Sequence, residues 1–383
     1  MTKAQIEKLD NQGRGICYID SKITFVKNAL PTEKVEVKLI KETKKYQEAI
    51  VKNYIETSKK RVKSPCPYFN QCGGCSLLHS TYEDTLKYKK EKLENIMVKY
   101  AKQKTDIEII ASPNNLSYRN KITLKIKNGQ YGYFKNATHE LVKIKNCLLA
   151  EPAIQNFLKN LSHLHIKNGE LICRSNYNNE LLLWIKTKEP IIPDIEYLKK
   201  HHKIAGIILN GKVIHGEPSF IEIINKQIFT VSYDSFFQVN RQICSTLFHL
   251  VNEYIKEEEI ILDLYCGVGT LGINARKKAK KVYGIEIVKN AVLNAITNAK
   301  INKRNNMYYI LGEVASSLSK IQEQINTVIV DPPRMGLDNT TKEILINLKP
   351  SKIVYVSCDP ITLARDISDL SKFYKALTIK GLD

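Results

Sequence analysis

The carboxyl-terminal part of the chain constrains the fold most, because strand-like and helix-like segments alternate there. A helix is expected at 241–255, followed by strands at 260–264 and 281–285 and by further strands near Val328 and Val354. Alternation of this kind predicts a doubly wound, mainly parallel α/β sheet of the Rossmann-like type. Such sheets bind ligands at the carboxyl ends of their strands, so motifs that directly follow a strand are the informative ones.

A glycine-rich turn from Cys266 to Gly272 joins the first of these strands to a helix. Glu286 ends the next strand, 19 residues after Gly267. Glycines at such a turn let the backbone approach a ligand closely, and the carboxylate can hold both hydroxyls of a ribose. The spacing therefore predicts a nucleotide site, and it fits a nicotinamide dinucleotide and S-adenosylmethionine equally well.

Two further motifs follow strands at the same edge. Asp331-Pro-Pro-Arg334 comes after an apolar run and offers a carboxylate for a polar ligand or base edge and a guanidinium for a phosphate. Cys358 follows the next run, within Ser-Cys-Asp-Pro. A lone cysteine is more often a small buried apolar residue, but a thiol at the ligand edge of the sheet is a candidate nucleophile.

Two β-rich units precede this part of the chain. Short alternating runs between Lys8 and Tyr54 predict a small barrel, a helix with an apolar core-facing stripe is expected at 82–102, and residues 107–230 contain several strand candidates. Residues 1–65 hold 15 Lys and Arg against 8 Asp and Glu, and the whole chain has a net charge of +20. This balance favours a polyanionic partner, nucleic acid foremost.

The nine cysteines cannot all be paired in internal disulfides. Cys66, Cys72 and Cys75 form Cys-x5-Cys-Gly-Gly-Cys, and Cys147 lies further along. Four thiols suit a zinc ion or an iron–sulfur cluster, and the spacing does not choose between them. Structural roles are expected for Cys17, Cys173, Cys244 and Cys266. No run approaches the ~18 apolar residues of a membrane helix, and no signal peptide opens the chain, so a cytoplasmic protein is expected.

Together these motifs resemble one family, the S-adenosylmethionine-dependent RNA (uracil-5-)-methyltransferases, and within it the iron–sulfur branch that acts on 23S ribosomal RNA. The resemblance also rests on segments 28–33, 117–121, 235–240 and 263–269. It implies three units: an OB-like barrel of the TRAM type at 1–58, an iron–sulfur segment with a central β-rich RNA-binding domain at 59–230, and a methyltransferase domain at 231–383.

The resemblance also implies roles for single residues. Cys358 would be the nucleophile that adds to carbon 6 of a uridine in 23S RNA, so that carbon 5 accepts the methyl group. S-adenosylmethionine would be bound by Gln238, Tyr265, Glu286 and Asp331. A 4Fe-4S cluster with a structural role would be held by Cys66, Cys72, Cys75 and Cys147. The expected partner is ribosomal RNA, and the enzyme is expected to be a monomer.

One departure from the family pattern concerns the end of the chain. The family continues beyond a strand expected at 376–380 into Phe-Pro-x-Thr-x-His-x-Glu, whose Glu serves as the base, whereas this sequence stops at Asp383. This form is therefore expected to bind cofactor and to turn over poorly, stalling as a covalent RNA adduct.

Two alternatives stay open. The first is a transfer RNA uracil-5 methyltransferase, and the second a non-catalytic RNA-binding iron–sulfur protein with a vestigial cofactor pocket. A nicotinamide-dependent dehydrogenase is disfavoured, because nothing supplies a hydride-transfer constellation. The sequence does not specify the target uridine, or whether one or two are modified.

Overall fold

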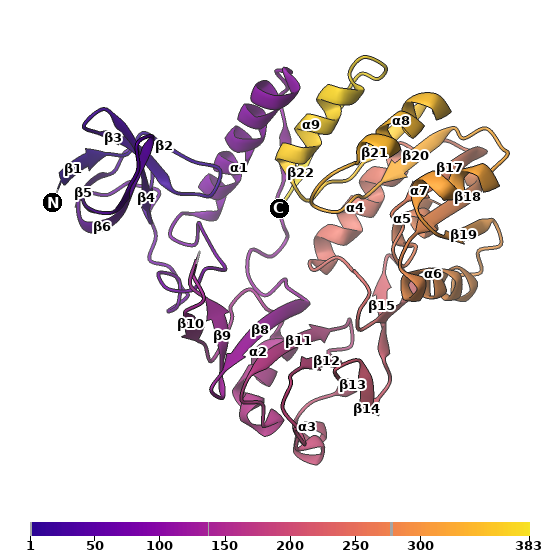
Figure 1. Cartoon of the computed structure of the whole chain (residues 1–383), viewed down its shortest axis with the longest axis horizontal. Helices are drawn as coiled ribbons and strands as arrows, with labels where there is room; N and C mark the ends of the chain where they lie inside the picture. Colours follow the sequence, from indigo (N-terminus) through magenta and orange to yellow (C-terminus); the bar gives the residue numbers. More distant parts are fainter. Residues whose placement is uncertain (1, 137, 276–278) are drawn as a thin grey trace.

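Three sheets form the frame of the molecule. The computed structural model describes residues 2–136, 138–275 and 279–383, and in these ranges it contains a six-stranded, a seven-stranded and a five-stranded sheet, with two smaller two-stranded sheets. The sheets follow one another along the chain and form three lobes, with the seven-stranded sheet between the other two (Figure 1). No helix among the described residues is long and apolar enough to cross a membrane.

The amino-terminal sheet curls into the small barrel that the sequence predicts. Its strands are β1 (Thr2–Gln5), β2 (Lys8–Leu9), β3 (Gly15–Ile19), β4 (Lys22–Lys27), β5 (Lys34–Glu42) and β6 (Tyr46–Glu56), in the order β1-β5-β6-β4-β3-β2. Val35 and Val37 of β5 are buried while Lys34 and Lys38 are exposed, the period-two pattern of a half-buried strand. The sheet closes because β1 pairs with β5 at one edge, while the backbone N–H of Glu7, just after β1, donates to Ile16 of β3 near the other.

A long helix connects the barrel to the rest of the molecule. Helix α1 (Tyr82–Ile96) begins at Thr81, whose side chain caps it, and continues as a π-helical turn at Met97–Ala101, which confirms the helix expected at 82–102. Its apolar stripe is core: Ile96 and Met97 are buried with Ala364 of α9 (Pro360–Leu370) in one cluster. The first half of the chain thereby packs directly on the last helix.

The central sheet supports the middle lobe. Its order is β10-β9-β8-β11-β12-β13-β14. The strands are β8 (Lys121–Lys127), β9 (Gln130–Phe134), β10 (Leu141–Lys143), β11 (Gly169–Ser175), β12 (Leu181–Lys186), β13 (Ile204–Leu209) and β14 (Lys212–Gly216). Ile122, Leu124 and Ile126 of β8 are buried in one core cluster with Phe157 of α2 (Pro152–Phe157). A 3₁₀ segment (Leu158–Leu164) and α3 (Ile195–His201) add to this core, and neither they nor α2 were expected from the sequence.

A two-stranded hairpin leads into the carboxyl-terminal lobe. It consists of β15 (Ser219–Ile224) and β16 (Gln227–Ser232), and it docks on α6 (Lys289–Ile301). The Asn298 side chain accepts a hydrogen bond from Thr230 N at 2.6 Å, and Asn302 exchanges two bonds with the Ile228 backbone. The boundary expected at residue 230 therefore falls inside a strand that packs on the carboxyl-terminal lobe.

The carboxyl-terminal sheet is parallel throughout, in the order β19-β18-β17-β20-β21. This confirms the doubly wound α/β prediction. Its elements are α4 (Arg241–Glu253), β17 (Glu259–Leu264), α5 (Thr270–Ala275), β18 (Ala279–Glu286), α6, β19 (Met307–Leu311), α7 (Val314–Ser317), β20 (Thr327–Val330), α8 (Asn339–Leu348), β21 (Lys352–Tyr355) and α9. Strand β19 was not expected.

The last strand lies apart from this sheet. A strand was expected at 376–380, but the structure forms β22 at Lys380–Leu382 instead. It pairs in parallel with β7 (Glu108–Ile110), which follows α1 in the chain, so the expected position is wrong by several residues. Residues 374–379 have no regular secondary structure and lie between α9, which packs on α1, and β22.

Candidate active site and cysteine cavity

Four strand ends meet at one edge of the carboxyl-terminal sheet. Tyr265 follows β17, Glu286 ends β18, Asp331 follows β20, and Cys358 comes three residues after β21. Neighbouring parallel strands present their carboxyl ends at the same edge, where such sheets bind ligands. The structure thus places these four sequence-predicted residues along one edge, while their individual roles stay predictions.

The glycine-rich turn has the open surface that a nucleotide needs. Gly267 and Gly269 have φ of 54° and 82°, the left-handed region that favours glycine. A Cβ placed at Gly267 would meet no atom within 4 Å, so the space above it is free for a ligand. Tyr265 also has a left-handed φ of 60°, which costs a non-glycine residue of order 1 kcal/mol or more. Strain of this kind is typical of a ligand-binding turn.

Glu286 holds the turn together. Its Oε2 accepts a hydrogen bond from Gly267 N at 3.0 Å, and its Oε1 accepts one from Val288 N at 2.9 Å. A carboxylate has about four lone-pair sites, so two remain for the hydroxyls of a ribose. The chain's own residues therefore fit the adenosyl group that the sequence analysis places here.

Asp263 is a candidate site residue to which the sequence analysis gave no role. It lies in β17, is 1% exposed, and accepts from Gly272 N through Oδ2 at 2.9 Å. Its Oδ1 is buried without a hydrogen-bond partner in the part of the chain that the structure describes. Burial raises the pKa of this carboxyl to about 8. The sequence feature that could have indicated Asp263 is an acidic residue inside an otherwise apolar strand, directly before the glycine turn.

Asp331 is the second perturbed acid at this edge. It is partly buried, and burial raises its pKa to about 6. Two acids whose pKa values are raised by burial lie at the same sheet edge as the open turn, which marks this edge as a candidate functional site.

The segment 234–240 links the sheet edge to the central lobe. Gln238 is partly buried, and its backbone oxygen accepts from Asn120 Nδ2 at 3.0 Å. Asn240 caps α4 by accepting from Gln242 N and Ile243 N. Phe236 in the same segment is 65% exposed, an unusual position for a large aromatic side chain.

The nucleophile candidate is accessible. Cys358 is exposed, in contrast to Cys17, Cys173, Cys244 and Cys266, which are buried. The loop around Cys358 is ordered by its neighbours: Ser357 Oγ donates to Asp359 O at 2.9 Å, and Asp359 caps α9. A thiol on an ordered loop before a helix that packs on α1 has a defined position at the edge of the sheet.

A separate cavity collects the four other cysteines. Cys66, Cys72, Cys75 and Cys147 line it together with Arg119 and Tyr133, and its volume is about 50 Å³. No disulfide joins the thiols. Burial raises the pKa of Cys75 to about 12 and also raises that of Cys72, whereas the Arg119 charge lowers both.

The four thiols do not form an assembled metal centre among the described residues. Within 2–136, 138–275 and 279–383, no group of three or more His, Cys, Asp or Glu side chains could hold one metal ion. The donor set is therefore gathered around one cavity, and a metal centre there stays a prediction. Gly73 lets the cysteine-rich segment pass close to the backbone at Asn136, because a Cβ at Gly73 would lie 2.9 Å from Asn136 N.

The motif at 117–121 spans the two sites. Arg119, which the resemblance assigned to an RNA-facing motif, lines the cysteine cavity, and its Nε is buried with no hydrogen-bond partner among the described atoms. The next residue, Asn120, donates its backbone N–H to Val239 at 2.9 Å. Two residues of one motif thus connect the cysteine cavity to the segment that carries Gln238.

Comparison with known proteins identifies the family. The tRNA (uracil-5-)-methyltransferase family matches residues 207–380, and the TRAM domain family matches residues 3–52. An uncharacterized RNA methyltransferase of Clostridium tetani is 31% identical over 99% of this chain and 92% of its own length. One of Aquifex aeolicus is 32% identical over 100% and 94%.

A solved structure agrees with these matches. The Pyrococcus abyssi tRNA (uracil-54, C5)-methyltransferase, in complex with S-adenosyl-L-homocysteine, superposes with a TM-score of 0.80 at 25% identity, over 100% of this chain and 96% of that one. The barrel at the amino terminus, the parallel sheet and the glycine turn above are consistent with this likeness. The chain belongs to the RNA (uracil-5-)-methyltransferase family and is an S-adenosylmethionine-dependent RNA methyltransferase with an amino-terminal TRAM domain.

Proposed function

We propose that this enzyme methylates carbon 5 of a uridine in 23S ribosomal RNA and that Cys358 is its nucleophile. The observation that carries the proposal is the exposed Cys358 thiol at the same sheet edge as Glu286 and Asp331. The four-cysteine set favours the ribosomal RNA branch, by the resemblance described above. The Pyrococcus enzyme, named for its action on tRNA, supports transfer RNA as the second candidate substrate.

The reaction needs a nucleophile because carbon 5 of uracil is too electron-poor to attack unaided. The Cys358 thiolate adds to carbon 6, and the electron pair of the 5,6 double bond moves onto the ring as an enolate. Bound S-adenosylmethionine supplies an electrophilic methyl group on a sulfonium. Carbon 5 takes this methyl group, and the broken carbon–sulfur bond leaves its electrons on the departing thioether. A base then removes the carbon-5 proton, the Cys358–carbon 6 bond breaks, and the thiolate is regenerated.

Residues at the sheet edge hold the cofactor in this proposal. Glu286 accepts from the ribose hydroxyls, and Tyr265 packs beside the adenosyl group. The Tyr265 hydroxyl is 3.2 Å from Thr341 Oγ1 and 3.5 Å from Asp338 Oδ2, so the N-terminal end of α8 fixes the ring. Asp331 and Gln238 complete the cofactor site around the remaining polar groups.

We propose that the cysteine cavity holds a 4Fe-4S cluster through Cys66, Cys72, Cys75 and Cys147. Four thiols without any other acidic or histidine ligand are the donor set that such clusters use. The cavity joins 66–78 to Tyr133 and 144–149, which supports a structural role.

We also propose that the enzyme is a cytoplasmic monomer with working units at 1–58, 59–230 and 231–383, the last of which extends back to take in the hairpin β15–β16. Nine cysteines without a disulfide suit a reducing compartment, which supports the cytoplasmic assignment.

Mass spectrometry of RNA tests the function. The protein is incubated with methyl-deuterated S-adenosylmethionine and either unmodified 23S RNA fragments or unmodified transfer RNA, and the nucleosides are analysed. Label on a uridine of the 23S fragments is expected, either released as 5-methyluridine or retained in a covalent adduct on the Cys358 peptide, and Cys358→Ala should abolish both while S-adenosylhomocysteine still binds in calorimetry. Label only in transfer RNA would select the second candidate, and label in cytidine would overturn the reaction.

The cluster is tested independently of methylation. Anaerobically purified protein should contain iron and acid-labile sulfide and should absorb visible light, and Cys66→Ser should lose both. Stoichiometric zinc with no iron would contradict the cluster and leave the methyl-transfer proposal intact.

A further inference from the structure

One face of the central sheet concentrates positive charge. Side chains alternate along β8, so that Ile122 and Leu124 face the core while Lys121 and Lys125 face the other side. The register places Arg174 of β11 directly opposite Lys121. Directly paired residues lie on the same side of a sheet, so these three cations share one face.

Further charges on this face partly compensate one another. Glu170 lies opposite Lys125 in β8 and opposite Lys186 in β12. Its carboxylate is 2.6 Å from the Lys125 ammonium and 3.8 Å from that of Lys186, whose Nζ also lies 3.8 Å from the Trp184 ring centroid. The single Glu170 carboxylate thereby partly neutralises both lysines.

Lys121 and Arg174 have no such compensation. Neither forms an ion pair with any described residue, although Glu170 acts on Lys121 and Asp234 on Arg174 from a distance. Arg174 is 3% exposed, and its Nη1 donates to the neutral carbonyl of Ser232 at 3.2 Å. Its Nη2 is buried and has no hydrogen-bond partner in the described structure.

This arrangement is electrostatically costly without a ligand. Burial and the charges of Arg174 and Lys186 lower the pKa of Lys121 to about 8, and burial lowers that of Arg174 to about 10. A buried charge without a partner destabilises a protein, and a buried polar group without a partner calls for an explanation. An anion bound at Lys121 would supply a partner for that ammonium group and would offset part of the cost of the Arg174 charge opposite it.

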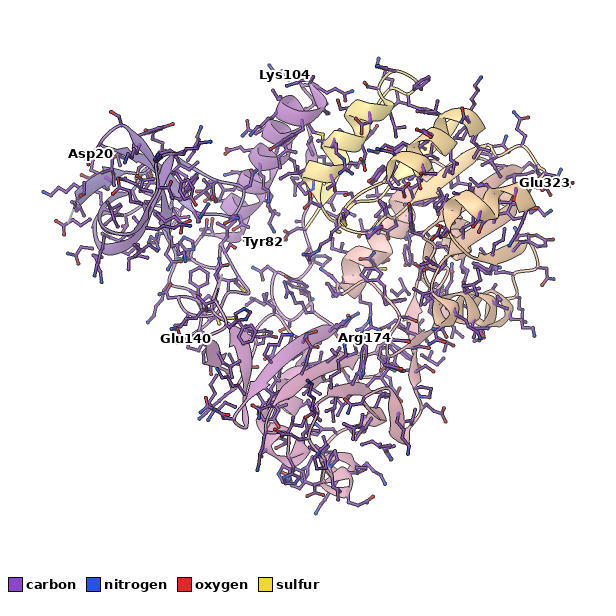
Figure 2. The ribbon with its side chains drawn as sticks, in the orientation of Figure 1. Asp20, Tyr82, Lys104, Glu140, Arg174 and Glu323 are labelled. Carbon is purple, nitrogen blue, oxygen red and sulfur yellow. The ribbon has the colours of Figure 1, made fainter. Side chains whose placement is uncertain are left out.

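The position of the pair relates it to the active site. Lys121 follows Asn120, whose side chain and backbone N–H bond the backbone oxygens of Gln238 and Val239. Arg174 precedes Ser175, whose N–H donates to Asn120 O at 2.9 Å. Figure 2 shows Arg174 where the central sheet approaches the hairpin β15–β16, beside the carboxyl-terminal lobe. The uncompensated charge therefore lies next to the segment with Gln238 and the exposed Phe236.

We propose that Lys121 binds a backbone phosphate of the RNA substrate next to the target nucleotide, and that the buried Arg174 opposite it adds positive potential to this phosphate site. Ammonium and guanidinium groups bind phosphate oxygens through strong charge-assisted hydrogen bonds. A base must be unstacked to reach a catalytic pocket, and a fixed phosphate beside it offsets part of that cost. This inference rests on the proposed placement of the target uridine at Cys358, and it adds a contact that orients the RNA strand carrying that uridine.

Charge-neutralising variants with a matched control test the site. Lys121→Gln removes the accessible cation, and Lys127→Gln removes an exposed lysine from the other end of the same strand. The affinity for single-stranded target RNA is measured by fluorescence anisotropy over a range of salt concentrations. Lys121→Gln should weaken binding about tenfold, the effect of losing one charge-assisted hydrogen bond. It should also reduce the slope of log affinity against log salt by about 0.7, the value for one phosphate contact of a single strand.

Each outcome is decisive. An unchanged slope for Lys121→Gln, or an equal loss for Lys127→Gln, would overturn the phosphate site. A loss of S-adenosylhomocysteine affinity in Lys121→Gln would overturn it as well, and would assign the pair to the cofactor carboxylate. Arg174→Lys keeps the charge and should retain the salt slope, which separates charge from folding effects. Because the readout is RNA binding, a failure of Cys358 chemistry would leave this result interpretable.

Discussion

The buried carboxyl of Asp263 gives a quantitative prediction about pH. Asp263 is 1% exposed and has one oxygen without a partner among the described residues, and burial raises its pKa from 3.8 to about 8. The folded state therefore binds one proton more than the unfolded state between about pH 4 and pH 8. Stability conferred by the neutral carboxyl is fully present below this window and is lost as the pH rises through it. Asn is neutral at every pH and can still accept from Gly272, so Asp263→Asn removes this dependence.

The magnitude follows from the size of the shift. One pH unit inside the window changes the free energy of unfolding by about 1.4 kcal/mol. Between pH 5.5 and pH 7.5 the wild type should lose ~3 kcal/mol relative to Asp263→Asn.

Because proteins open locally in separate cooperative units, a local probe is needed. Hydrogen exchange of peptides from β17, corrected for intrinsic exchange rates, reports the relevant opening. Glu343→Gln, on the exposed side of α8, serves as the control. The same pH dependence of exchange in wild type and Asp263→Asn would refute the reasoning.

Two further substitutions test the sheet edge. Glu286→Gln replaces the carboxylate that accepts from Gly267 N and Val288 N. It should weaken S-adenosylhomocysteine binding about tenfold in calorimetry, and an unchanged affinity would contradict the assigned role. Asp359→Ala removes the acceptor for two N–H groups of α9 and should destabilise that helix by about 1 kcal/mol in hydrogen exchange. Asp338→Ala, the equivalent change at α8, should leave α9 unaffected, and equal exchange of α9 in both variants would contradict the capping argument.

Local sequence patterns predicted much of the fold. The β17 turn was recognisable because apolar strand, glycine turn, helix and acid follow one another within 30 residues, and the period of apolar residues predicted α1. Strand β19 was missed because it is a partly exposed edge strand, Met-Tyr-Tyr-Ile-Leu, without a polar motif after it. The pairing of β22 with β7 joins segments about 270 residues apart, and nothing local encodes it.

Parts of the site depend on register that the sequence does not reveal. The four cysteines could be grouped by spacing, but only the fold shows that Arg119 lines their cavity. Lys121 and Arg174 lie 53 residues apart and became neighbours through the β8–β11 register. Asp263 was visible as an acid in an apolar strand, whereas its unpartnered oxygen depends on packing.

The covalent step at Cys358 can be observed directly with RNA that contains 5-fluorouridine at the target site. Fluorine replaces the proton that the base must remove, so the bond between the Cys358 sulfur and carbon 6 should persist after methyl transfer. We expect a denaturation-resistant protein–RNA complex that requires S-adenosylmethionine, with the nucleotide on the Cys358 peptide in mass spectrometry and no complex for Cys358→Ala. A complex of equal yield in Cys358→Ala, or one attached to another cysteine, would contradict the account.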